Sequence, residues 1–168
     1  MVNLERITAT YAQSITKCIK DTENNGDNKI TAEMTENCVT KTLGILQENG
    51  IYASFVYMLS RIKTAANLAN HKPESHCYIY IVHQLITLLR DPGTQNLGLV
   101  LDEVARNETP IKKGEIPIKK GKILSYVSQK LTNTIDDVLI VHKLFEQTLI
   151  FARYGAKALK PLQEEGTN

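Results

Sequence analysis

Apolar residues recur every three or four positions along most of this 168-residue chain, which is the spacing of amphipathic α-helices. The first predicted helix ends before residue 23, and its apolar stripe consists of Leu4, Ile7, Tyr11, Ile15, Cys18 and Ile19. A second helix is predicted over about residues 32–48. A third follows at once, because Gly50 suits the left-handed conformation that often ends a helix. The packing face of this third helix consists of Phe55, Met58, Leu59, Ile62, Ala66 and Ala69.

A fourth helix is predicted over about residues 74–90, with Pro73 in its first turn. It is apolar around most of its circumference, so we expect it to be the central and most buried element. Short helices are predicted near residues 97–106 and 123–131, and a long final helix begins near residue 134. Its predicted inward positions are Ile135, Val138, Leu139, Leu144, Phe145, Leu149, Ala152 and Ala156. The expected fold is an all-α, single-domain bundle of six to seven helices over residues 1–168.

A direct repeat interrupts this helical pattern. "PIKKGEI" at residues 110–116 is followed by "PIKKGKI" at residues 117–123. Pro and Gly at every seventh position argue against a continuous helix, so we expect a basic loop insertion at residues 108–122. Its five ammonium groups belong to Lys112, Lys113, Lys119, Lys120 and Lys122. Such a loop suits contact with a phosphate backbone, and it equally suits a solubilising insertion.

The bulk composition favours a chain that folds on its own inside the cell. At this length about 70% of the unfolded surface becomes buried, so neither a disulfide nor a metal is needed to hold the core. The three cysteines are an odd number in apolar helical patterns, which predicts buried thiols in a reducing cytoplasm. The first residues lack the apolar run of a signal peptide, and the longest uncharged run, residues 75–89, is too short to span a bilayer.

The chain shows little sign of catalytic chemistry. It contains no phosphate-binding loop, HExxH sequence or paired CxxC, and we predict that it is not an enzyme and has no cofactor. His76 and His83 share one helix face beside Cys77, which favours packed histidines over a metal site. A small helical enzyme using these three residues is the alternative. Asp136 and Asp137 open the last helix, where carboxylates stabilise the helix dipole.

The stretch "ENNGDNKITAEM", residues 23–34, is similar to a twelve-residue EF-hand loop. Glu23, Asn25 and Asp27 fall at the first three ligand positions, but Met34 replaces the glutamate that would hold calcium with both oxygens. The simpler interpretation is a polar turn in which Thr31 caps the next helix. A calcium-responsive helical module is therefore the alternative function.

Formal net charge is only +2, but Lys and Arg outnumber Asp and Glu over residues 110–168. On the last helix Arg153 and Lys157 are four residues apart and share a face, and Tyr154 beside them either stacks or packs. Three further basic residues, Arg6, Lys41 and Arg61, extend this set of candidate RNA contacts. Each of them, taken alone, is also compatible with a solvated charge.

One segment is similar to a known family. Residues 45–63, "ILQENGIYASFVYMLSRIK", resemble the hallmark segment of the small helical subunit of the type III-B CRISPR (Cmr) RNA-silencing complex. In that segment a helix ends in an Asn-Gly turn, and an aliphatic residue starts the next helix. "LERITATYA", "IVHQLITLLRD" and "FARYGAKALKPLQEEG" resemble the opening, central and final helices of that family.

The resemblance implies a non-catalytic subunit that functions in antiviral defence. Such subunits stack as several copies beside guide RNA and target RNA, together with other subunits of the effector complex. They contact the RNA backbone rather than its sequence. Arg6, Arg61, Arg153 and Lys157 fall where the matching helices present basic residues, whereas the repeated "PIKKG" loop departs from the family pattern.

Overall fold

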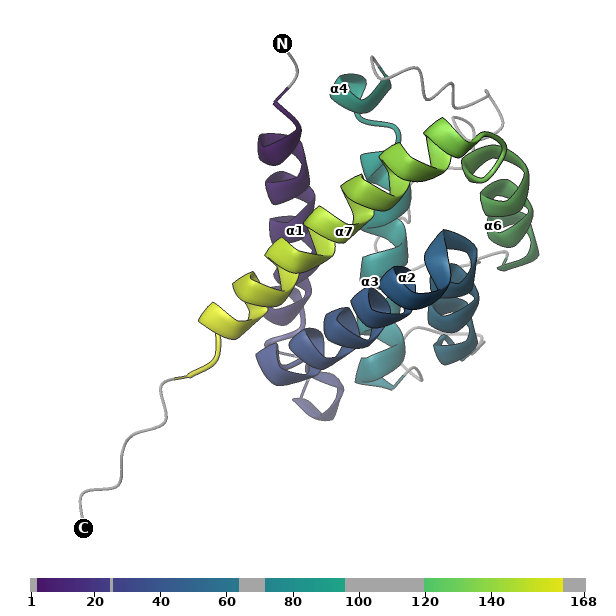
Figure 1. Cartoon of the computed structure of the whole chain (residues 1–168). Coiled ribbons are helices and arrows are strands. Elements are labelled where there is room, and N and C mark those ends of the chain that lie inside the picture. The colour runs from purple at the N-terminus through teal and green to yellow at the C-terminus, as the bar shows by residue number, and fades with distance from the viewer. Residues whose placement is uncertain (1–2, 25, 64–71, 96–119, 162–168) are drawn as a thin grey trace.

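The computed structural model describes residues 3–24, 26–63, 72–95 and 120–161. Within these ranges the regular structure is helical, which confirms the predicted all-α single-domain bundle. Two helices, α1 (Leu4–Asp21) and α2 (Ala32–Arg61), contact both α7 (Ile135–Ala158) and α3 (Pro73–Leu88). Figure 1 shows α7 crossing in front of α1, while α3 runs behind α7 and α2. The predicted helix at residues 97–106 lies outside the described residues, as does most of the loop at residues 108–122.

Side-chain caps begin two of the described helices. The Asn3 side chain accepts the Arg6 backbone N–H at 3.0 Å and starts α1. Thr31 accepts the Met34 N–H at 3.1 Å and starts α2, so the predicted cap after the polar turn is confirmed. Each of these bonds satisfies a backbone donor that has no partner inside its helix.

A sharp bend at Gly50 divides α2 into the two helices that the sequence predicts. Gly50 has φ 84° and ψ −174°, a conformation outside the helical region that residues with a Cβ rarely adopt. The helix therefore changes direction without an intervening loop, and Phe55 and Met58 beyond the bend are fully buried. The second half ends at Arg61, so the predicted packing positions Ala66 and Ala69 lie outside the described residues.

The fourth predicted helix is α3, which begins with Pro73 in its first turn. Its buried residues lie around most of its circumference, and Tyr78 is the largest fully buried side chain of the described core. A short helix, α4 (Pro92–Gln95), follows directly, and the Asp91 side chain accepts the Gly93 N–H at 2.8 Å. Among the described helices, none is long and apolar enough to cross a membrane.

Helical structure begins before the end predicted for the basic loop. Helix α6 (Lys120–Tyr126) continues into a π-helical segment, Val127–Leu131. Lys120 and Lys122 therefore lie on a helix, and the prediction of a loop up to residue 122 is wrong by three residues. Gly121 does not prevent this helix, because a single glycine weakens a helix by only about 1 kcal/mol.

Helix α7 closes the core. Phe145 is fully buried, and its ring centre lies 5.9 Å from that of Phe55 on α2. Leu149, Ala152 and Ala156 continue the buried face. The predicted inward positions Ile135 and Leu139 are wrong, since they are 77% and 63% exposed. The buried face of α7 runs through positions 141, 145, 149, 152 and 156. Ile135 and Leu139 lie off this face, on the side that carries polar residues in the first turns.

Candidate nucleic-acid interface

Three cations lie along the last two turns of α7 and just beyond its end. Arg153, Lys157 and Lys160 are all exposed. The four-residue spacing of Arg153 and Lys157 on a continuous helix confirms that they share a face. We call Arg153, Lys157 and Lys160 the α7 basic face.

Two carboxylates from the start of α2, Glu36 and Glu33, lie near this face. Glu36 Oε2 is 2.6 Å from Lys160 Nζ, and this ion pair joins the start of α2 to the end of α7. The pKa of Glu36 is lowered, mainly because Lys160 hydrogen-bonds to it, and further by the charges of Lys157 and Arg153. Glu36 therefore lies in the field of all three cations, and the charge of Glu33 also acts on Lys160. The three cations outnumber these two carboxylates.

Small residues on the other side of α7 hold the basic face in place. A Cβ atom at Gly155 would lie only 3.3 Å from Thr16 Cγ2 on α1, so the absent side chain allows the helices to approach closely. Ala152 and Ala156 are fully buried on the same side. With this side packed on α1, the opposite side of α7 faces outward, and Tyr154 beside it is 61% exposed. Of the two predicted roles of Tyr154, packing and stacking, this exposure leaves its ring open to stack.

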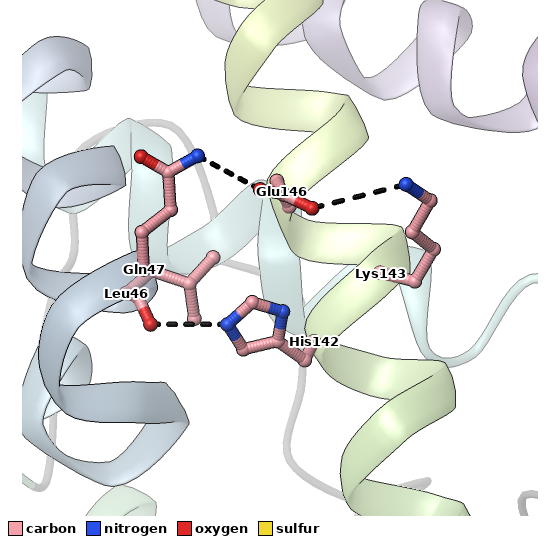
Figure 2. Close-up of polar contacts among 5 residues, drawn as sticks. All are labelled: Leu46, Gln47, His142, Lys143 and Glu146. Atoms are coloured by element: carbon pink, nitrogen blue, oxygen red, sulfur yellow. Dashed lines mark hydrogen bonds and ion pairs between the residues drawn. The ribbon is translucent and has the colours of Figure 1, made fainter.

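A polar seam between α2 and α7 fixes how the two helices lie together (Figure 2). His142 Nε2 donates to the Leu46 carbonyl at 3.0 Å, just before the bend in α2. Gln47 Nε2 donates to Glu146 at 2.8 Å, and Lys143 lies 3.9 Å from the same carboxylate. Because Leu46 faces His142 while Glu36 faces Lys160, the first half of α2 runs antiparallel to α7. Sequence reasoning missed these partners, since single-chain spacing carries no signal for a contact between distant helices.

Two other predicted RNA contacts, Lys41 and Arg61, gather near Glu74 at the start of α3. Lys41 and Glu74 line an open pocket of about 360 Å3. The Arg61 guanidinium lies 5.2 Å from the centre of the Tyr57 ring. Its pKa is raised mainly by Tyr57, with a smaller effect of Glu74. The charge of Glu74 offsets part of the positive charge of this second group.

The remaining predicted contacts are scattered. Lys120 Nζ donates to the Ile62 carbonyl at the end of α2, so this ammonium has a structural role. Lys122 is exposed on α6. Arg6 is exposed in the first turn of α1, ten residues, or about 15 Å along the helix, from the crossing with α7 at Thr16. The three remaining loop lysines, Lys112, Lys113 and Lys119, lie outside the described residues.

The EF-hand-like stretch forms a compact turn. Gly26–Asn28 is a single 3-10 turn, and Thr22 Oγ1 accepts the Ile30 N–H at 2.8 Å. Thr31 uses its side-chain oxygen as the cap of α2, and Met34 packs against the core. Asn25 lies outside the described residues. The calcium-responsive module remains a prediction.

Two of the candidates for catalysis, Cys77 and His83, lie on α3. Burial lowers the pKa of His83, and the charge of Arg90 lowers it further. Cys77 is fully buried. At the start of α7 the Thr134 side chain accepts the Asp137 N–H at 3.1 Å and donates to its carboxylate at 2.7 Å, so Asp137 has the predicted capping role. Within the described ranges, no group of three or more His, Cys, Asp or Glu residues is arranged to hold a metal ion.

The fold and this surface define a helical bundle with a basic face on its last described helix. Comparisons with models of protein families, with characterised proteins and with solved structures find no match for the chain. The assignment of a function therefore rests on the residues themselves.

Proposed function

We propose that this chain is a non-catalytic RNA-binding subunit of a cytoplasmic ribonucleoprotein assembly. The resemblance in its sequence suggests that the assembly is a type III-B CRISPR effector complex acting in antiviral defence. The observation that carries the proposal is the α7 basic face, where three exposed cations outnumber the two carboxylates beside them, Glu36 and Glu33. The other subunits of the complex and further copies of the chain itself would be its protein partners.

The proposed contact is electrostatic. Lysine and arginine side chains displace counterions from phosphates, which gives binding that depends on salt and tolerates any sequence. Arg153 and Lys157 supply two charges that have no close ion pair of their own among the described contacts, whereas Lys160 is paired with Glu36. The exposed Tyr154 ring adds a surface on which an unpaired base can stack. Several copies along one strand would raise a weak single contact through multivalency.

A binding experiment with paired variants tests the contact. Arg153→Ala combined with Lys157→Ala removes two charges from the α7 basic face. Lys29→Ala combined with Lys143→Ala removes two exposed charges elsewhere and is the matched control. Fluorescence anisotropy with two labelled single-stranded RNAs of unrelated sequence is measured over a series of salt concentrations. We expect the first variant to weaken binding to both RNAs and to lower the salt slope by about 1.4, at about 0.7 per phosphate contact.

Equal losses in the two double variants would mean that only net charge matters, and the α7 basic face would then be rejected as the contact. The assembly is tested separately by purifying the tagged chain from its native cell at moderate salt. Recovery of short guide RNAs with other effector subunits is the expected result. Recovery of the chain without RNA or partner proteins would contradict the proposal.

A further inference from the structure

The most exposed large apolar side chains of the described residues gather on one side of α7. They are Ile135, Leu139 and Tyr154. Buried residues of the same helix, such as Val141 and Ala152, lie on the other side, which packs on α1 and α2. Figure 1 shows α7 across the front of the bundle, over α1 and α3. The outward side of α7 is therefore an apolar surface exposed to solvent, which is the usual sign of an interaction site.

The spacing of residues on this outward side is the same when it is read from either end. They follow one another at intervals of four, four, three, four and four positions, so they lie on one face of the helix. In order they are Ile135, Leu139, Lys143, Glu146, Ile150 and Tyr154. We call these six residues, together with Asp136 and Arg153 beside the two ends, the α7 outer stripe. Apolar residues stand at both ends of it, and charges of opposite sign stand at mirrored positions.

We propose that the α7 outer stripe pairs with the same stripe of a second copy of the chain, with the two helices antiparallel about a two-fold axis. In the register that the spacing sets, Ile135 faces Tyr154 of the second copy. Leu139 faces Ile150 of the second copy, which is partly exposed in the single chain. A two-fold contact repeats each pair, so the apolar residues at both ends of the stripe are covered.

The charges of the stripe are complementary in the same register. Asp136 faces Arg153 of the second copy, and Lys143 faces Glu146, so every charged pair joins opposite signs. Asp136 and Arg153 are both exposed, and neither forms an ion pair within the described part of the chain. A parallel two-fold arrangement would instead place each charge beside its own copy. Repulsion between like charges therefore favours the antiparallel pair.

The proposed pairing also bears on access to the α7 basic face. One pair of helices buries less surface than a standard protein interface of about 1,600 Å2, so we expect a dimer that dissociates on dilution. Arg153 and Tyr154 belong both to the α7 outer stripe and to the proposed RNA contact. RNA and a second copy would therefore compete for these two residues, a consequence that rests on the proposed function.

Sedimentation equilibrium of the full chain without RNA tests the pairing, from about 1 to about 500 µM protein so that weak dimers are covered. We expect the mass to rise from that of one chain towards that of two. Asp136→Arg or Arg153→Asp should each weaken the dimer about tenfold, because two ion pairs become two like-charge pairs. Combining both substitutions restores opposite signs and should recover the dimer. Asp27→Arg makes the same charge change at an exposed position outside the stripe and is the matched control.

A monomer at every concentration would overturn the proposal. A dimer that Asp136→Arg weakens no more than Asp27→Arg would also overturn it, as would a double variant that stays as weak as the single ones. Circular dichroism checks the fold of each variant, and Leu139→Glu, at a strongly exposed position, should abolish the dimer without changing the spectrum. Because no RNA is present, a chain that pairs as expected but binds no RNA would reject the proposed function and not the pairing.

Discussion

Replacing Gly50 by alanine tests whether the bend in α2 depends on glycine. Gly50 has φ 84° and ψ −174°, and a Cβ atom added there would meet no atom within 4 Å. The substitution therefore causes no clash, and its effect comes from backbone conformation alone. Gly44 is the matched control, because it lies in the same helix, has no positive φ, and also has open space around its Cβ position.

The two substitutions are expected to change stability in opposite directions. An L-residue held in a region of backbone space that glycine alone occupies readily costs about 1–3 kcal/mol. Alanine also reduces the entropy of the unfolded chain, which offsets about 0.4–1 kcal/mol of this. Gly50→Ala should thus lower the free energy of unfolding by about 1–2 kcal/mol. Gly44→Ala should raise it by about 0.5–1 kcal/mol, because alanine favours a helix interior.

The assay is urea unfolding followed by far-ultraviolet circular dichroism, with thermal unfolding as a second measure. The opposite shifts should separate the two midpoint temperatures by roughly 4–10 °C for a chain of this size. If Gly50→Ala is as stable as the unsubstituted chain, or gains stability as Gly44→Ala does, α2 does not need glycine at its bend. That result would refute the inference that the positive φ at residue 50 requires glycine.

Three further predictions use the same unfolding measurements or a titration. Phe145→Ala should lower the free energy of unfolding by about 3–5 kcal/mol, because the ring is fully buried. Leu139→Ala should change it by no more than about 0.5 kcal/mol, because that side chain is 63% exposed. Equal effects of the two substitutions would contradict the buried face assigned to α7. Burial first, and then the neighbouring carboxylates Asp91 and Asp21, raise the pKa of Tyr11 and Tyr80 to about 12 from the usual 10.0. Between about pH 10 and pH 12 the folded state therefore binds more protons than the unfolded state. The contribution of these two tyrosines to the free energy of unfolding is complete below about pH 10 and is lost as the pH rises through about 12. A free energy of unfolding that stays constant over this range would contradict the prediction. Calorimetric titration with calcium should give no heat up to roughly millimolar ion, because residues 23–34 lack the bidentate glutamate, and saturable binding heat would instead favour the calcium-responsive module.

The features of the fold that the sequence predicts correctly are local ones. Thr31 and Gly50 act within a few residues of their own positions, as a cap and as a bend, and both are confirmed. Ile135 and Leu139 are apolar but lie off the buried line of α7. Which side of α7 is buried depends on where α1 and α2 pack against it, and spacing along one helix does not contain that information.

In the candidate site, too, the features that the sequence predicts correctly are local ones. Arg153 and Lys157 share a face because they are four residues apart on one helix, which is a local property. Their compensating carboxylate Glu36, and the bond from Lys120 to the Ile62 carbonyl, join segments far apart in the chain. Such partners follow only from the packing of the helices, so sequence reasoning gave the cations without their neighbours.

The packing of α7 across α1 and α2 also has a consequence for biosynthesis. Helix α7 is the last of the described helices to leave the ribosome. It contributes the buried side chains of Phe145 and Leu149 to the core that it forms with α1 and α2. Until it has emerged, the nascent chain exposes apolar surface around Phe55 that α7 later covers. Such surface is prone to aggregation and is a substrate for chaperones. Chains truncated before α7 should therefore be cleared by proteolysis rather than accumulate as a smaller folded bundle.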